Sequence, residues 1–133
     1  MADPRYTRHA GGVFILKYHF VWCPKYRRPV LVDQIAKDLE ALLREKAEQL
    51  QVTIEALEIM PDHVHLFVAV DPTEAPQRLA NQFKGYTSRI LRQRYPALKS
   101  RLPNLWSRSY YVGSIGHVSD KTVRQYIEAQ KRS

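Results

Sequence analysis

The chain has 133 residues, is 44% hydrophobic and contains one cysteine, Cys23, which predicts a single compact domain over residues 1–133 and excludes an internal disulfide or a cysteine-based zinc cluster. Residues 1–12 are polar and do not resemble a signal peptide, and no apolar run approaches the ~20 residues of a membrane span. We therefore expect an unsecreted, cytoplasmic protein without membrane partners, in which Cys23 is a packed and inert thiol.

The formal net charge of +8 is concentrated in the second half of the chain. Residues 1–76 hold 9 Lys and Arg against 11 Asp and Glu, whereas residues 77–133 hold 12 against only Asp120 and Glu128. Such a charge predicts an anionic partner, and a nucleic acid, a ribosome or a membrane surface would each satisfy it. We expect the basic half to face the polyanion.

The first predicted elements are a buried strand and an amphipathic helix. Residues 13–23 are rich in β-branched and aromatic residues, which favours a strand buried on much of its surface. A basic loop over residues 24–29 ends this strand. Asp33 is placed to cap a helix that runs to about Leu50, with apolar residues along one stripe and acidic residues on the other face.

The middle of the chain predicts a hairpin followed by a second helix. Residues 52–60 and 63–70 have the composition of strands, and only a Pro-Asp pair separates them, so an antiparallel pair joined by a tight turn is expected. From about residue 73 to residue 95 a helical pattern returns, with a possible break near Gly85. Residues 96–103 are expected to form a linker.

The last predicted elements are a strand over residues 105–112, or two short strands that reach Ile115, and a helix from Asp120 to the C-terminus, capped by Ser119. The order strand, helix, strand, strand, helix, strand predicts an α+β fold of the ferredoxin-like (RRM-like) type, an antiparallel sheet with its helices on one face. The added C-terminal helix carries Tyr126. The other face of the sheet is expected to stay free for a ligand or partner.

His63 and His65 are the first candidates for chemistry. The alternation of a strand sends both imidazoles to one face, while Val64 points to the opposite layer. Two histidines can hold one divalent cation and leave coordination positions open for phosphate oxygens, as a catalytic metal requires. Two histidines on a solvent-facing strand would show the same spacing, so the motif alone leaves both interpretations open.

Tyr126 and Gln130 lie one helical turn apart, so the phenol and the amide project from the same side of the last helix. The phenol would act as a nucleophile, and the amide oxygen would complete a metal site. An ordinary amphipathic helix that packs its tyrosine beside Val123 and Ile127 would look the same.

Five segments, in this order and across nearly the whole chain, resemble the single-tyrosine HUH transposases, the TnpA type encoded by the smallest bacterial insertion sequences. The histidine pair lies in its proline-aspartate context, and the tyrosine and glutamine lie in a C-terminal helix. No catalytic position departs from the family pattern. The segments are residues 18–31 (YHFVWCPKYRRPVL), 58–70 (EIMPDHVHLFVAV), 84–91 (KGYTSRIL), 105–112 (LWSRSYYV) and 123–130 (VRQYIEAQ).

This resemblance implies a DNA transposase that cleaves and rejoins single-stranded DNA at insertion-sequence ends, where it recognises DNA hairpins. His63, His65 and Gln130 would bind Mg²⁺ or Mn²⁺, and Tyr126 would attack the scissile phosphorus to leave a 5′-phosphotyrosine and a free 3′-hydroxyl group. The resemblance also implies a homodimer in which the tyrosine helix of each subunit is able to complete the metal site of the other.

The candidates for DNA contact are basic residues and one glycine. Three arginines share a helix face with Gly85, where the missing side chain would allow close backbone approach, and nearby aromatic rings would stack on unpaired bases. A solvated face is an equally ordinary explanation, and Trp106 and His19 are expected to be core residues. The candidates are Lys25, Arg27, Arg28, Arg78, Lys84, Gly85, Arg89, Arg92 and Arg108.

Two alternative functions remain open. One is a relative of these transposases that acts on repeated extragenic palindromes. The other is a non-catalytic, RRM-like module that binds single-stranded RNA or DNA, which would bind without metal and form no covalent adduct.

Overall fold

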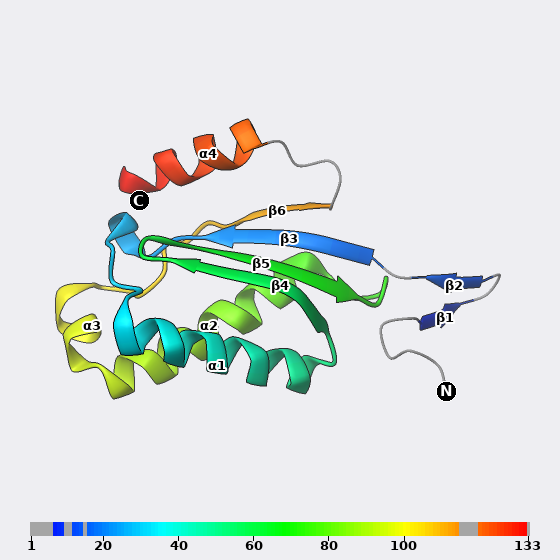
Figure 1. The fold of residues 1–133 in the computed structure, drawn as a ribbon, viewed down its shortest axis with the longest axis horizontal. Coiled ribbons are helices and arrows are strands. Elements are labelled where there is room, and N and C mark those ends of the chain that lie inside the picture. The colour runs from blue at the N-terminus through cyan, green and yellow to red at the C-terminus, as the bar shows by residue number, and fades with distance from the viewer. Residues whose placement is uncertain (1–6, 10–11, 15, 115–119, 133) are drawn as a thin grey trace.

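The computed structural model describes residues 7–9, 12–14, 16–114 and 120–132 (Figure 1). Its main sheet consists of four antiparallel strands in the order β4-β5-β3-β6. These strands are β3 (Leu16–Trp22), β4 (Thr53–Met60), β5 (His63–Val70) and β6 (Tyr111–Ser114). The helices are α1 (Asp33–Leu50), α2 (Pro76–Arg94), α3 (Pro96–Arg101) and α4 (Asp120–Ala129). Two short 3-10 helices, η1 (Lys25–Arg27) and η2 (Gln130–Arg132), and a small hairpin of β1 (Thr7–His9) and β2 (Gly12–Phe14) complete the described elements.

This topology confirms the predicted ferredoxin-like fold. The chain passes through β3, α1, β4, β5, α2 and β6 in the expected order, and the two central strands of the sheet, β5 and β3, are separated in sequence by α1 and β4. The hairpin of β4 and β5 pairs Met60 with His63 across the predicted two-residue turn. A tight turn at this point fixes the register of both strands, and with it the face on which each side chain of β5 lies.

The alternation of β5 separates an apolar layer from a polar one. Val64, Leu66 and Val68 are fully buried and belong to the core formed with α1 and α2, whose contribution includes Leu39 and Phe83. The intervening residues of β5 therefore face the other side of the sheet. Figure 1 shows α4 on that other side, so the face expected to stay free is partly covered by the C-terminal helix.

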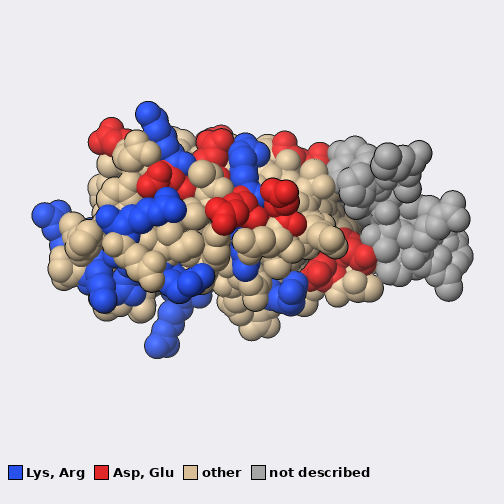
Figure 2. Space-filling view, turned by 90° about the horizontal axis from the view of Figure 1, so that it is seen from below, with Lys and Arg blue, Asp and Glu red and all other residues tan. Residues whose placement is uncertain are grey.

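Charge is unevenly distributed over the helical layer. The sequence of α1 contains five acidic and three basic residues, whereas α2 and α3 contain basic residues and no acidic ones. Figure 2 looks onto this layer: Lys and Arg side chains gather at the left end, where α3 lies in Figure 1, and acidic side chains gather toward the middle. The basic half of the sequence thus forms part of the helical surface.

Several predicted boundaries were wrong. Asp33 does not cap α1: it is the first residue of the helix, with a φ of 52°, and the helix has no side-chain cap. Gly85 does not break α2, which is continuous from Pro76 to Arg94. Residues 96–103 are not only a linker, because they include α3, which begins at a proline in the position that proline favours.

The predicted strand over residues 105–112 begins only at Tyr111. The residues before it are held otherwise: Trp106 forms an isolated bridge with Pro24, and the amide of Ser107 donates to the carbonyl of Cys23. The predicted first strand corresponds to β3 and a separate short β2. Ser119, the predicted helix cap, lies outside the described residues.

Within the part of the chain that the structure describes, none of the helices combines the length and apolar character needed to cross a lipid bilayer.

Candidate active site

His63 and His65 lie on the same face of β5, as their spacing predicts. Their ring centroids are 4.9 Å apart and the ring planes are nearly perpendicular, at 82°. Both residues are half-buried. Two imidazoles at this separation can donate lone pairs to a common cation between them.

Each histidine has a partner at its Nδ1 atom. His63 Nδ1 lies 2.7 Å from Asp62 Oδ1, so His63 donates from Nδ1, because a carboxylate only accepts. His65 Nδ1 lies 2.9 Å from Nε2 of His19. Where His65 donates in this bond, Nε2 of both metal-binding candidates keeps its lone pair, which is the tautomer that hydrogen bonds to ligand histidines normally fix.

The electrostatics of His65 and His19 favour neutral imidazole rings. Burial, and then the neighbouring His63, lowers the pKa of His65. Burial, and then His65, lowers the pKa of His19 to about 4. Neutral imidazole is the form that binds a metal, so the lowered pKa of His65 suits a ligand to a divalent cation. The described residues contain no group of three or more His, Cys, Asp or Glu placed to hold a metal.

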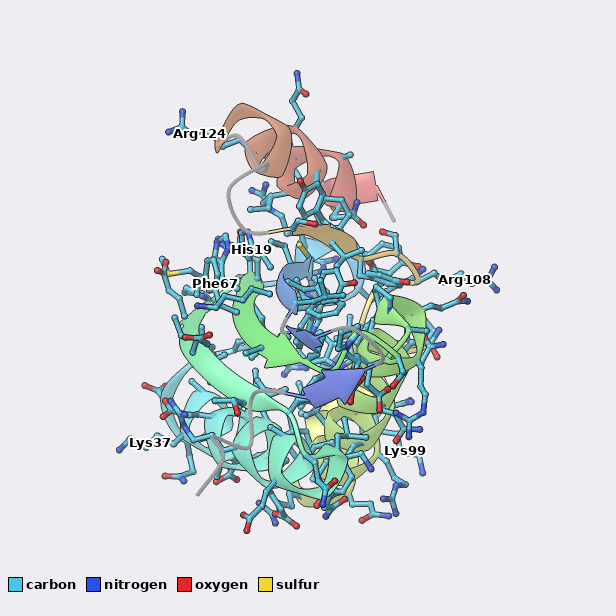
Figure 3. All side chains as sticks on the ribbon, turned by 90° about the vertical axis from the view of Figure 1, so that its right-hand side faces the viewer. His19, Lys37, Phe67, Lys99, Arg108 and Arg124 are labelled. Carbon is cyan, nitrogen blue, oxygen red and sulfur yellow. The ribbon has the colours of Figure 1, made fainter. Side chains whose placement is uncertain are left out.

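His19 was expected to be a hydrogen-bonded core histidine, and its burial at 7% exposure confirms this. Its partners place it within the site all the same. Its ring stacks on Phe67 at 4.1 Å and 7°, and it contacts His65 through the hydrogen bond above. Figure 3 shows His19 and Phe67 on the side of the sheet that faces α4. The third histidine supports His65 from the adjacent strand.

Tyr126 and Gln130 share one side of the C-terminal helix, as predicted, and both contact the segment before β6. Oε1 of Gln130 accepts hydrogen bonds from the hydroxyl groups of Ser107 at 3.0 Å and Ser109 at 2.9 Å. The Ser109 hydroxyl also lies 3.2 Å from the phenol oxygen of Tyr126. Burial raises the pKa of Tyr126 to about 12, so the phenol is protonated at neutral pH.

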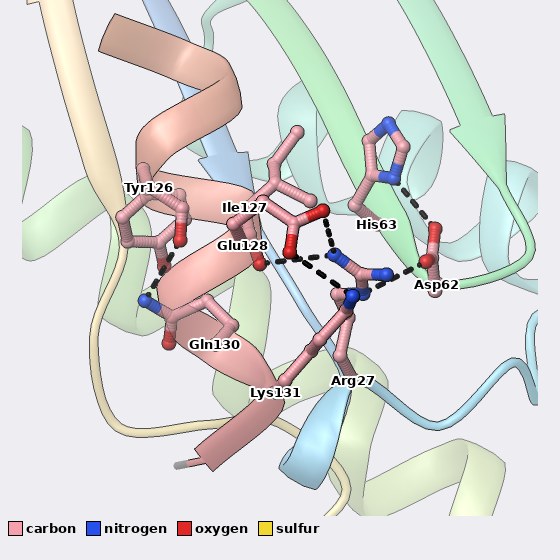
Figure 4. Close-up of polar contacts among 8 residues, drawn as sticks. All are labelled: Arg27, Asp62, His63, Tyr126, Ile127, Glu128, Gln130 and Lys131. Atoms are coloured by element: carbon pink, nitrogen blue, oxygen red, sulfur yellow. Dashed lines mark hydrogen bonds and ion pairs between the residues drawn. The ribbon is translucent and has the colours of Figure 1, made fainter.

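A row of aromatic rings connects Tyr126 to the histidines across the sheet. The Tyr126 ring is 6.2 Å from that of Tyr111, which is 6.4 Å from that of His19, and His19 stacks on His65 at 5.1 Å. The phenol is therefore on the same face as the imidazoles but not in contact with them. Figure 4 shows Tyr126 and Gln130 on one side of α4 and His63 beyond the other side.

Arg27 occupies the space between His63 and α4. Its Nε lies 3.0 Å from Asp62 Oδ2, and its Nη1 lies 3.4 Å from Glu128 Oε1 and donates to the carbonyl of Ile127 at 3.4 Å (Figure 4). The Arg27 side chain is only 17% exposed. This geometry does not fit the prediction that Arg27 contacts DNA.

Lys84, another predicted DNA contact, is half-buried and its amino group is bound by the segment before β6. Its amino group donates to three consecutive backbone carbonyls, those of Ser107, Arg108 and Ser109, at 2.8 to 3.2 Å. Burial lowers the pKa of Lys84 to about 8. All three donors of the ammonium group are occupied. Lys84 therefore supports residues 107–109, called here the serine segment, rather than a phosphate.

The other predicted contacts are more exposed. Arg108 and Arg89 are exposed, and Arg108 projects outward in Figure 3. Arg78 of α2 pairs at 2.8 Å with Glu74, which precedes the helix, and half-buried Arg92 donates to the carbonyl of Pro103. Lys25 lies over the ring of exposed Tyr26, Arg28 is exposed, and Gly85 is exposed with nothing within 4 Å of where a Cβ atom would be.

Two core predictions held. Trp106 is 5% exposed and donates from Nε1 to the hydroxyl of Thr87 at 3.0 Å. Cys23 is fully buried, and burial raises its pKa to about 12, which keeps the thiol protonated and unreactive.

Comparison with known proteins assigns the chain to a family. Residues 12–130 match the family described as "Transposase IS200 like". The chain belongs to the IS200-like transposase family. This transposase is 38% identical over 122 residues to the ISDra2 transposase TnpA of Deinococcus radiodurans, which covers 90% of this chain and 87% of the relative. It is 31% identical over 116 residues to the transposase for insertion sequence element IS200 of Salmonella typhimurium, over 86% of this chain and 76% of the relative.

Solved structures support the same assignment. The IS200-like transposase superposes on a crystal structure from Deinococcus radiodurans R1, assigned as a transposase, with a TM-score of 0.87 and 36% identity, over 96% of this chain and 99% of the other. A REP-associated tyrosine transposase bound to a REP hairpin gives a TM-score of 0.56 at 16% identity, over 96% of this chain and 69% of the other, which shows a shared fold alone.

Proposed function

We propose that this IS200-like transposase cleaves and rejoins single-stranded DNA at insertion-sequence ends, with Tyr126 as the nucleophile. The observation that carries the proposal is the placement of His63, His65 and the Tyr126 helix on one face of the sheet, linked by the ring row through Tyr111 and His19. Attack of the phenol oxygen on phosphorus forms a 5′-phosphotyrosine and releases the 3′-hydroxyl group. Because a phosphoester is retained, a later 3′-hydroxyl group can attack it and rejoin strands without ATP.

His63 and His65 would hold Mg²⁺ or Mn²⁺ through their Nε2 atoms, and Gln130 would contribute its amide oxygen. A divalent cation supplies charge neutralisation at the phosphate and stabilises the departing 3′-oxygen. Imidazole ligands favour Mn²⁺ over Mg²⁺ in intrinsic affinity. Such a cation would assist Tyr126, because a pKa of about 12 makes the free phenol a poor nucleophile at neutral pH.

Tyr126 and Gln130 would reach the histidines of a second subunit in a homodimer. Within one subunit the serine segment engages both of their polar groups, and Arg27 lies between His63 and the helix. A C-terminal helix that docks on the partner subunit would bring Tyr126 and Gln130 to the metal site of that subunit. This arrangement would explain why they do not meet the histidines of their own subunit. The sheet also ends in β4 on one side and β6 on the other, and pairing of subunits is one way to cover such edges.

The DNA partner would be a hairpin near each element end. The structural neighbour that binds a REP hairpin shares the fold, and the basic helices α2 and α3 offer phosphate contacts. Exposed arginines such as Arg89 and Arg108 are the strongest candidates, because their side chains are not committed to the interior.

The test is incubation of the protein with labelled single-stranded DNA from both flanks of its gene and Mn²⁺, followed by a denaturing gel. Wild type should give a slow, protein-linked band, and EDTA should abolish it. Tyr126→Phe should remove the band while hairpin binding stays within about two-fold, because only one oxygen is lost. Tyr95→Phe removes a phenol that contacts Asp38, away from the site, and should keep the band.

Other outcomes identify the alternatives. An equal adduct in Tyr126→Phe would refute the assignment of the nucleophile. Binding without metal and without any adduct would indicate an RRM-like binding module. Sequencing of the cleaved strands would reveal a relative that acts on extragenic palindromes, since its sites would lie away from the gene's own flanks.

A further inference from the structure

The backbone around Arg27 is strained in a way that local sequence does not require. Tyr26 has φ 59° and ψ 18°, and Arg27 has φ 52°, so two consecutive bulky residues adopt the left-handed conformation. Each such residue has a conformational cost, and strain of this kind persists only where the surroundings impose it. The result is that Arg27 turns inward at 17% exposure, while its neighbours Tyr26 and Arg28 are exposed.

The inward guanidinium group holds the carboxylate that in turn holds His63. Asp62 uses Oδ2 for Arg27 Nε at 3.0 Å and Oδ1 for His63 Nδ1 at 2.7 Å. A carboxylate bound at both oxygens has its plane fixed, and the hydrogen bond it accepts then fixes the tautomer and direction of the imidazole. Polar contacts thus run from the Arg27 guanidinium group through the Asp62 carboxylate to Nδ1 of His63, and Nε2 lies at the far end of this chain.

The second arm of Arg27, toward the C-terminal helix, is weaker. Arg27 Nη1 donates to the carbonyl of Ile127 at 3.4 Å and lies 3.4 Å from Glu128 Oε1. The Glu128 side chain is 64% exposed and also pairs with Lys131 at 3.0 Å. By contrast, the Asp62 side chain is 27% exposed, and its Oδ2 lies closer to Arg27, at 3.0 Å from Nε. Exposed ion pairs contribute little, so the Glu128 arm can open without disturbing the Asp62 arm.

We propose that Arg27 is a positioning residue that fixes Asp62 and, through it, the His63 ring, and that it keeps this role whether or not the C-terminal helix is docked beside it. The proposal rests on the proposed function only in taking His63 as a metal ligand. It replaces the expectation that Arg27 binds DNA.

The first experiment measures Mn²⁺ affinity of the DNA-free protein by electron paramagnetic resonance. Arg27→Ala should bind Mn²⁺ about 10-fold more weakly than wild type, the usual effect of losing the support of a ligand histidine. Arg27→Lys should restore part of the affinity. Glu128→Gln should stay within about two-fold of wild type. Arg44→Ala is the control, because Arg44 also pairs with a glutamate, Glu40, but on the exposed face of α1.

The second experiment reads the His63 ring without metal, by long-range ¹H–¹⁵N NMR. Wild type should show His63 protonated at Nδ1. Arg27→Ala, recorded well below its melting temperature, should show a mixture of tautomers, whereas Arg44→Ala should match wild type. A His63 tautomer that is the same in Arg27→Ala and wild type would overturn the proposal, as would a loss of Mn²⁺ affinity in Glu128→Gln equal to that in Arg27→Ala. Undiminished Mn²⁺ affinity in His63→Ala would instead overturn the metal site, and the tautomer measurement would still decide the role of Arg27.

Discussion

The hydroxyl group of Ser109 joins the phenol of Tyr126 to the amide of Gln130. It lies 3.2 Å from the phenol oxygen and 2.9 Å from Gln130 Oε1. A hydroxyl has one proton, and the amide oxygen can only accept, so Ser109 donates to Gln130 and accepts a hydrogen bond from the phenol of Tyr126. In this docked position burial keeps the phenol of Tyr126 protonated, and the serine hydroxyl group engages the glutamine oxygen.

Removing both serine hydroxyl groups should loosen the C-terminal helix. Ser107→Ala combined with Ser109→Ala removes the bonds to Gln130 and the contact with Tyr126, roughly 1–2 kcal/mol in total. Hydrogen exchange followed by mass spectrometry should show α4 amides exchanging about 5–30-fold faster. Ser100→Ala, on α3, should leave that rate unchanged. Unaltered exchange in the double variant would mean that other contacts hold the helix.

The raised pKa of Tyr126 predicts a pH dependence of stability. At a pH between about 10 and about 12 the unfolded chain releases the phenol proton while the folded protein keeps it. The stabilisation is thus present below the unfolded pKa and is lost as pH rises through the folded value. Urea unfolding should show that the midpoint of wild type declines more than that of Tyr126→Phe between about pH 9 and about pH 12. Parallel declines would contradict a buried phenol.

The sequence predicted those parts of the fold that follow from local pattern. The Pro-Asp turn between β4 and β5 set the register, and strand alternation then placed His63 and His65 on one face, opposite buried Val64. Helical periodicity likewise placed Tyr126 and Gln130 together, as their shared contacts with Ser109 confirm. Each of these relationships depends on residues within about one turn of each other.

Relationships between distant segments escaped prediction. Lys84 and Arg27 are basic residues in basic stretches, and nothing local distinguishes them from surface cations, yet one binds carbonyls 23 to 25 residues away and the other reaches Ile127. Ser107 and Ser109 were hidden in a segment predicted to be a strand. The sequence gives one signal for them: Ser107 and Ser109 are two residues apart, a spacing that places both hydroxyl groups on one side of an extended chain.

Cys23 offers a chemical check on the core beside the site. Because burial raises its pKa to about 12, the thiolate that reacts with alkylating reagents is far scarcer than in an unfolded chain at about pH 8. Iodoacetamide should therefore modify the native protein at least about 100-fold more slowly than the protein in urea. Mass spectrometry of the modified peptide measures both rates. Comparable rates would show that the region around β3 opens readily.

Replacement of Lys84 should affect the stability of the protein, whereas replacement of Arg108 should affect the salt dependence of hairpin binding. The ammonium group of Lys84 donates to three carbonyls, so Lys84→Met should lower the free energy of unfolding by about 1.5–3 kcal/mol in urea denaturation. It should leave the salt dependence of hairpin binding unchanged, because the lysine neutralises no phosphate. Arg108 is exposed, and Arg108→Ala should instead reduce the slope of log affinity against log salt by about 1 with little change in stability. If Lys84→Met reduced the salt slope while stability stayed constant, Lys84 would have to leave its carbonyls to meet the DNA.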